Sequence, residues 1–168
     1  WTGSGTIISP DGLILTNAHV VYDTCYHIEQ LVIRVTEEQA APPVDRYLAK
    51  VIQVDTDLDL AVLYIASDLN GNAVNYTSLN LPAVPLGDSG TLQLGDPIVI
   101  LGYPGIGGDT ITLTRGEVSG FTAETGYGNR AFIKTSATIA GGNSGGLAVN
   151  ESGQLIGVPT QVGAGDDS

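Results

Sequence analysis

The sequence is poor in basic residues, and this shortage argues against a nucleic-acid-binding protein. Its 168 residues include only six Lys and Arg against 18 Asp and Glu, which gives a formal net charge of -12 at pH 7. The six bases are scattered singly along the chain. Because a nucleic-acid-binding domain gathers Lys and Arg on one face, we expect no nucleic-acid partner.

The chain also has a single cysteine, no methionine and no long apolar run. Cys25 alone offers neither an intrachain disulfide nor a thiolate pair for zinc. The acids Asp55, Asp57 and Asp59 alternate, but they lack the Gly turn and the distal Glu of an oxygen-ligand calcium loop. We therefore predict no metal and no cofactor. Since no run of about 18 apolar residues occurs, we also predict no membrane-spanning segment.

Glycine is abundant instead, at 23 residues, and short aliphatic or β-branched runs alternate with turn signals. Such alternation is typical of an all-β protein. A Pro- and Gly-rich segment at 81–97 separates two halves, so we predict an N-terminal unit at 1–80, a linker at 81–97 and a C-terminal unit at 98–168. The expected strands lie at 2–9, 13–16, 30–35, 47–54, 60–65, 98–102, 110–119, 131–136, 146–149 and 154–162.

One serine, Ser144, lies among glycines in the motif GGNSGG at 141–146. On its own this hexapeptide is equally compatible with a Gly-rich surface turn. Glycine neighbours also let a ligand backbone approach and let several N–H groups converge on one point. A serine becomes a nucleophile when a base, usually an imidazole oriented by a carboxylate, takes its proton.

The order of the polar residues limits the kind of serine enzyme. The only histidines, His19 and His27, both precede Ser144. The nucleophile elbow of α/β-hydrolases is thereby excluded, because those enzymes carry their histidine after the serine. A subtilisin order would need an acid before the histidine, and only Asp11 qualifies, within a Pro-Asp-Gly turn. The order that survives is His, Asp, Ser.

This order and four motifs resemble trypsin-like serine proteases of the bacterial HtrA/Deg type. The motifs are GSGTIISPDGLILTNAHVV at 3–21, DLAVLYI at 59–65, LPAVPLGDSGTLQLGDPIVILGYP at 81–104 and GGNSGG at 141–146. The resemblance implies a chymotrypsin-like fold of two six-stranded antiparallel β-barrels, with the last strand missing from this chain.

The resemblance also implies roles for single residues. It makes His19 the base, Asp59 the orienting carboxylate and Ser144 the nucleophile, and it forms the oxyanion hole from the N–H groups of Gly142 and Ser144. For substrate binding it implies Ile139, Val158, Thr160 and Val162.

Three positions bear on activation and specificity. Asn143 stands where pancreatic-type zymogens hold an Asp that pairs with a new N-terminus, and a neutral amide cannot form that ion pair. Nothing acidic lies where the base of the S1 pocket is expected, at Thr138 and Ile139. We therefore expect cleavage after small or medium aliphatic residues.

The implied function is a serine endopeptidase that acts on unfolded or misfolded polypeptides. The resemblance alone implies an extracytoplasmic bacterial setting, periplasmic or secreted, a homo-oligomer, and a PDZ module outside this chain. The alternative is a proteolytically silent domain of the same fold. Such a domain would bind unfolded chains while its oxyanion loop is misformed.

Overall fold

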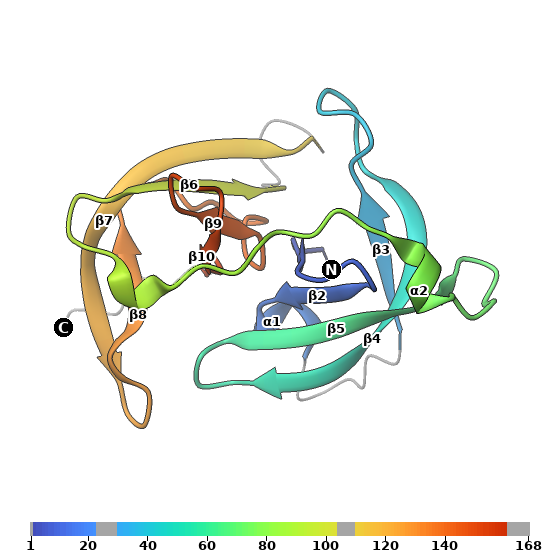
Figure 1. Cartoon of the computed structure of the whole chain (residues 1–168), viewed down its shortest axis with the longest axis horizontal. Helices are drawn as coiled ribbons and strands as arrows, with labels where there is room; N and C mark the ends of the chain where they lie inside the picture. Colours follow the sequence, from blue (N-terminus) through green and yellow to red (C-terminus); the bar gives the residue numbers. More distant parts are fainter. Residues whose placement is uncertain (1, 23–29, 104–109, 161–168) are drawn as a thin grey trace.

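Two antiparallel sheets, each built from one half of the sequence, form the protein (Figure 1). The computed structural model describes residues 2–22, 30–103 and 110–160. The first sheet has the strand order β1-β2-β5-β4-β3 and the second has the order β10-β9-β6-β7-β8. The strands are β1 Thr6–Ile7, β2 Leu13–Thr16, β3 Leu31–Val35, β4 Val44–Asp55, β5 Leu60–Asp68, β6 Pro97–Gly102, β7 Thr112–Glu124, β8 Gly128–Thr135, β9 Leu147–Val149 and β10 Leu155–Gly157.

The all-β prediction is confirmed, with one difference in the number of strands. Each sheet contains five strands within the described residues, where the resemblance implies six in the first unit and, with its last strand missing, five in the second. Helical structure in the same residues is limited to α1 Ala18–Val21, α2 Tyr76–Leu79 and a 3-10 turn, η1, at Ser89–Thr91. No helix in the described part of the chain is long and apolar enough to cross a membrane.

The first sheet closes around an aliphatic core because its strands alternate inward and outward side chains. β5 shows this most regularly, with every second residue from Ala61 to Ser67 buried. Ile14 from β2 and Ala49 from β4 pack with Leu63 and Ile65 in this core. Gly12, at φ +99°, closes the turn between β1 and β2, and an added Cβ there would meet Ile65. The short hairpin therefore lies directly on the core.

The second sheet has its own core and two long strands. Ile98 and Ile100 of β6 pack with Val118 of β7 and Ile156 of β10. β7 and β8 pair along most of their length, and in Figure 1 their hairpin ends at the lower left, beside the turn between β4 and β5. At its tip, the Tyr127 hydroxyl donates to the Asp55 carboxylate of the first sheet at 2.9 Å.

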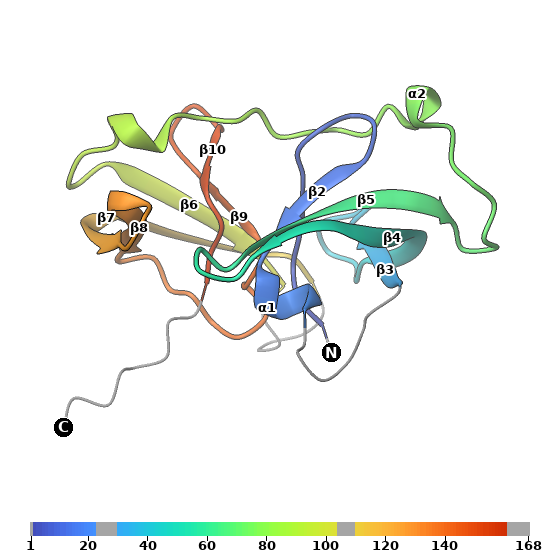
Figure 2. The ribbon, with the colours of Figure 1, turned by 90° about the horizontal axis from the view of Figure 1, so that it is seen from below.

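The segment between the sheets is bonded to both of them. Leu81 N donates to Pro10 O at 3.0 Å, and Val84 N donates to Ile7 O at 3.0 Å. On the other side, Leu155 N donates to Pro85 O and Gly87 N donates to Leu155 O, each at 2.8 Å. The same segment therefore contacts β1 with one part and β10 with the next. In both ribbon views α1 lies near the junction of the two sheets (Figures 1 and 2).

Candidate active site

His19 lies on α1, the single helical turn that follows β2. The apolar neighbours Ala18 and Val21 are buried, and this turns the His19 side chain outward, where it is 49% exposed. Its Nδ1 lies 2.8 Å from Asp59 Oδ2 and 3.0 Å from Asp59 Oδ1. Because a carboxylate can only accept, Nδ1 carries the hydrogen, and Nε2 is left with a free lone pair. Nε2 is thus the basic nitrogen of the pair.

Asp59 is held from several sides at the start of β5. Its Oδ1 also accepts the backbone N–H of His19 at 3.0 Å, and its Oδ2 accepts the Thr160 hydroxyl at 2.6 Å. The backbone of Asp59 has φ +54°, a left-handed conformation that costs a non-glycine residue about 1–2 kcal/mol. The buried amide of Asn17 donates to the Asp59 carbonyl at 2.8 Å. These bonds stabilise the unusual backbone and fix the carboxylate against His19.

The turn that precedes Asp59 is organised by Asp55. The Asp55 carboxylate accepts the N–H groups of Asp57 and Leu58 at 3.1 and 3.0 Å, and it also accepts the Tyr127 hydroxyl. These three donors lower the pKa of Asp55 below its ordinary value, with the Leu58 N–H as the largest cause and the Tyr127 hydroxyl as the next. Asp55 is therefore a structural acid of the turn, and among the acids of the described residues only Asp59 is hydrogen-bonded to His19.

The glycine-rich motif forms a tight turn in front of Ser144. Asn143 N donates to Ala140 O at 3.0 Å, and Gly142 has φ +100°. This bond and a positive φ at the third residue define a type II turn, in which the central peptide faces the opposite way from that of a type I turn. Within the described residues, neither the Gly141 carbonyl nor the Gly142 N–H has a hydrogen-bond partner. That peptide is therefore available to a ligand.

The loop that carries Ser144 is packed against both the N-terminal segment and the end of the second sheet. Ser4 N donates to Ser144 O at 2.9 Å, and Gly145 N donates to Pro159 O at 3.1 Å. A Cβ at Gly145 would overlap Ser4 O and Thr16 Oγ1, so only glycine allows this approach. The Ser144 loop thus contacts residues that lie within three positions of His19 and within one of Thr160. No hydrogen bond joins His19 to Ser144 in the described part of the structure.

Asn143 is buried beneath this turn. It is 2% exposed, and within the described residues its Oδ1 has no hydrogen-bond partner. Gly102 lies against it, where an added Cβ would come within 2.7 Å of Asn143 Oδ1. An ionised Asp at this position would be a buried charge, which is costly without a cation. The neutral amide suits a loop that forms without an ion pair.

The residues expected to bind substrate are less uniform in position. Ile139 packs partly buried against the core of the second sheet, and Val158 is half-buried after β10. Thr160 directs its hydroxyl to Asp59, a contact that the sequence did not suggest. The expected residue Val162 lies outside the described residues. Sequence reasoning also missed Ser4 and Asn17, although both lie inside recognised motifs.

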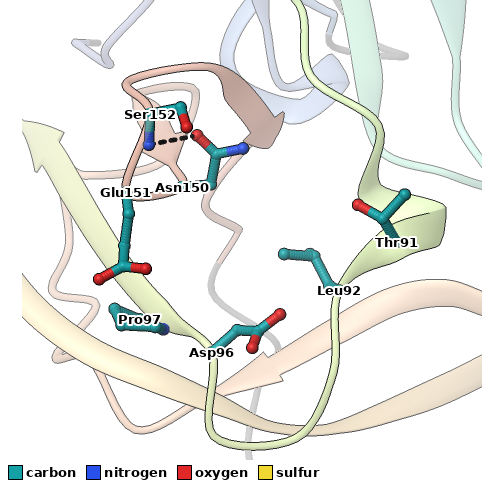
Figure 3. A pocket seen from close by; sticks show the side chains of 7 residues that line it. All are labelled: Thr91, Leu92, Asp96, Pro97, Asn150, Glu151 and Ser152. Carbon is teal, nitrogen blue, oxygen red and sulfur yellow. Dashed lines mark hydrogen bonds between the residues drawn. The ribbon is translucent and has the colours of Figure 1, made fainter.

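A small pocket of about 190 Å³ lies elsewhere on the second sheet (Figure 3). None of the expected catalytic residues lines it. Ser152 N donates to Asn150 Oδ1 at 3.0 Å on one side, which closes the turn between β9 and β10. The pocket lining consists of Thr91, Leu92, Asp96, Pro97, Asn150, Glu151 and Ser152.

Within the described residues, no group of three or more His, Cys, Asp and Glu side chains is arranged to hold a metal ion.

Comparison with protein families gives a match along most of the sequence. The family described as "Trypsin-like peptidase domain" matches residues 3–158. Among curated relatives, "Putative serine protease HhoB" from Synechocystis is 36% identical over 168 residues, covering 97% of this chain and 35% of the relative. "Probable periplasmic serine endoprotease DegP-like" from Chlamydia pneumoniae is 37% identical over 165 residues, covering 97% and 29%.

A mitochondrial relative and two solved structures extend the comparison. "Serine protease HTRA2, mitochondrial" from Drosophila willistoni is 38% identical over 161 residues, covering 93% of this chain and 32% of the relative. The chain thus spans about a third of the length of these curated relatives. The HtrA-type protease AlgW solved with a decapeptide superposes with a TM-score of 0.71 at 31% identity, covering 95% of this chain and 43% of that one. AlgW solved with a tripeptide gives 0.70 at 32% identity, covering 93% and 45%.

Proposed function

Because the chain belongs to the trypsin-like peptidases of the HtrA/DegP type, we propose that it is an active serine endopeptidase that cleaves unfolded or misfolded polypeptides. The observation that carries this proposal is the His19–Asp59 pair, with Nδ1 and Oδ2 2.8 Å apart, at the junction where the Ser144 loop contacts the first sheet. In this proposal His19, Asp59 and Ser144 are the catalytic residues.

The reaction follows from the state of His19. Nε2 removes the proton of the Ser144 hydroxyl while Oγ attacks the carbonyl carbon of the scissile peptide. The imidazolium then gives this proton to the leaving amine as the C–N bond breaks, which leaves an acyl-enzyme. A water, deprotonated by the same Nε2, attacks the ester carbonyl, and the imidazolium returns this proton to Ser144 Oγ as the C–O bond breaks, which releases the acid and free Ser144. The ionised Asp59 stabilises the imidazolium in both halves.

The oxyanion hole is formed by the N–H groups of Gly142 and Ser144. Support for this role comes from the type II turn and from the unpartnered Gly142 N–H. Two preorganised N–H donors stabilise the tetrahedral oxyanion, and the loss of one typically raises the barrier by about 2.7–4 kcal/mol. Gly142 allows this arrangement because a side chain rarely adopts its positive φ.

The proposal also covers the substrate preference and the division of the chain into units. From the resemblance we assign Ile139 and Val162 to the S1 pocket and Val158 and Thr160 to the binding of the substrate backbone, and we expect cleavage after small or medium aliphatic residues. The N-terminal unit at 1–80 supplies His19 and Asp59, and the C-terminal unit at 98–168 supplies Ser144. The segment 81–97 links the two units.

The setting proposed is extracytoplasmic and bacterial, which the relatives named as periplasmic DegP-like proteases support. A mitochondrial relative also occurs among the matches. A homo-oligomer and a PDZ module outside residues 1–168 remain predictions from the resemblance. That the curated relatives are about three times as long is compatible with additional domains in them.

A second candidate function is a non-cleaving domain that binds unfolded chains at the same site. The observation that favours it is that His19 and Ser144, both within the described residues, are not hydrogen-bonded to one another. Catalytic hydrogen bonds are often long in free enzymes and tighten only around substrate. We therefore favour the enzyme.

Labelling with a fluorophosphonate probe distinguishes the two functions. The folded wild-type chain should gain one probe mass at Ser144, and Ser144→Ala and His19→Ala should abolish labelling. Ser152→Ala, which removes an exposed serine hydroxyl on the β9–β10 turn, is the matched control and should label like wild type. Folded wild-type chain that binds denatured casein but never labels would favour the binder. Preferred cleavage after Lys or Arg in a peptide library would contradict the aliphatic preference.

A further inference from the structure

Ser4 precedes β1 and uses all of its polar atoms in contacts with residues distant in sequence. It is 5% exposed. Its Oγ donates to the Gly142 carbonyl at 2.6 Å and accepts the N–H of Tyr103 at 3.0 Å. Its backbone N–H donates to the Ser144 carbonyl at 2.9 Å, and its carbonyl accepts the Thr16 hydroxyl at 2.7 Å. One buried residue thus joins the end of β2 to the loop of the nucleophile.

We propose that Ser4 is a positioning residue that holds the oxyanion turn and the nucleophile in register with the base. The inference rests on the proposed function, because it assigns a role within that active site. Ser4 does not contact the reacting atoms. It acts through Gly142 on one side and through Thr16, three residues before His19, on the other.

The direction of the hydroxyl proton supports this role. Because the Tyr103 N–H occupies a lone pair of the Ser4 oxygen, the hydroxyl proton is directed at the Gly142 carbonyl. The peptide between Gly142 and Asn143 is then bonded at both ends, since Asn143 N donates to Ala140 O. Only the preceding peptide, which carries the Gly142 N–H, has no partner of its own among the described residues.

Loss of the Ser4 hydroxyl would release the Gly142 carbonyl, and the turn at 140–143 would then lose its fixed conformation. The backbone bond from Ser4 N to Ser144 O remains in an alanine variant, so the segment keeps its course. The expected defect is therefore in the alignment of the Gly142 N–H with the developing oxyanion. Such a defect lowers kcat and leaves KM unchanged, because the interaction is made in the transition state.

Thr6 supplies a matched control on the same segment. It is equally buried, at 5% exposed, and within the described residues its hydroxyl has no hydrogen-bond partner. Thr6→Val keeps the shape of the side chain and replaces only this hydroxyl. A general effect of altering buried hydroxyls near the N-terminus would appear in both variants. An effect through the oxyanion turn would appear only in Ser4→Ala.

The experiment measures kcat and KM of wild type, Ser4→Ala and Thr6→Val on one fluorogenic aliphatic peptide, with inhibition by its peptide boronic acid. Ser4→Ala should lower kcat and boronic acid affinity about fivefold, as expected for one ordinary hydrogen bond, with KM within twofold. Thr6→Val should match wild type. Equal kcat in all three proteins, or a defect confined to KM, would overturn the inference.

A second variant covers the case in which Ser4→Ala does not fold, and a structural comparison covers the case in which the wild type is inactive. Ser4→Cys takes the place of Ser4→Ala if the latter does not fold, since a thiol fills the site but donates weakly. If folded wild type neither labels nor cleaves, the proposed function fails, and the inference is decided by crystal structures of wild type and Ser4→Ala. The turn at 140–143, with Gly142 near φ +100°, should then persist in wild type and be lost in the variant. The same turn in both would refute the role of Ser4.

Discussion

Asn17 offers a sharp test of how the candidate catalytic acid is held. It is 1% exposed, its Nδ2 donates to the Asp59 carbonyl at 2.8 Å, and its Oδ1 has no partner within the described residues. Asn17→Ala removes one hydrogen bond, worth about 1 kcal/mol, and also removes an oxygen whose burial costs about 1–3 kcal/mol. These effects oppose each other, so the unfolding free energy of Asn17→Ala should lie within about 2 kcal/mol of the wild-type value.

Asn17→Asp changes the sign of this interaction with almost no change in volume. The amide donor becomes a carboxylate oxygen that faces the Asp59 carbonyl, and the new charge is buried without a cation. An uncompensated buried charge typically costs about 3–5 kcal/mol. At pH 7 this variant should therefore unfold at clearly lower urea concentration than Asn17→Ala, although it removes fewer atoms.

Urea unfolding followed by far-ultraviolet circular dichroism at pH 7 and at pH 4.5 measures both variants. Burial raises the pKa of the introduced carboxyl in the folded state. The folded protein then binds the proton more tightly than the unfolded chain, so the variant is most stable below the unfolded pKa of this carboxyl and loses stability as pH rises from there through the raised folded pKa. The deficit of Asn17→Asp relative to Asn17→Ala should shrink at pH 4.5. Equal midpoints for the two variants at pH 7, or a deficit that grows on acidification, would refute the reasoning.

Two other predictions concern the junction of the sheets. Tyr127→Phe should raise the pKa of Asp55 toward its ordinary value of 3.8 without reaching it, since the Leu58 N–H remains; a carboxyl titration by carbon-13 NMR measures this, and an unchanged pKa would contradict it. In the wild type the pKa of Asp55 is lower in the folded protein than in the unfolded chain. The ionised Asp55 therefore stabilises the folded state above the unfolded pKa, and this stabilisation is lost as pH falls through the folded pKa. Gly145→Ala should destabilise the fold by more than about 2 kcal/mol in urea, because its Cβ overlaps the Ser4 carbonyl. Gly71→Ala, with a similar φ of +83° but no neighbour within 4 Å, is its control and should cost only about 1 kcal/mol.

Much of the fold was predictable because short aliphatic runs and turn residues alternate clearly. The first hairpin, with its Pro-Asp-Gly turn, and the regularly alternating β5 are such cases. The ends of the longest strands were less predictable. β7 continues to Glu124 through polar residues, beyond the expected end at 119. Contacts with β8 explain this, since the Arg130 guanidinium lies 3.7 Å from the centre of the Phe121 ring.

The polar support of the site was not predictable from the sequence. Ser4 and Gly142 are 138 residues apart, Thr160 and Asp59 are 101 apart, and Asn17 and Asp59 are 42 apart. No local pattern encodes such pairs, because a serine, threonine or asparagine can satisfy its hydrogen bonds in many ways. The His19–Asp59 pair was accessible because the chemistry of a serine nucleophile requires a base and an acid. No comparable chemical requirement identifies, from the sequence, the residues that act by hydrogen bonding to backbone carbonyls.

The segment between the sheets has a consequence for where the protein can change length. Since Val84 is bonded to Ile7 and the Pro85 carbonyl is bonded to Leu155, adjacent residues are committed to opposite halves of the molecule. An inserted residue here would shift one half relative to the other and disturb the alignment of His19 with Ser144. At the exposed tip around Gly71, an insertion would only lengthen a loop. Foreign sequences, or new ends made by circular permutation, therefore belong at that tip, and the link between the halves has a fixed length.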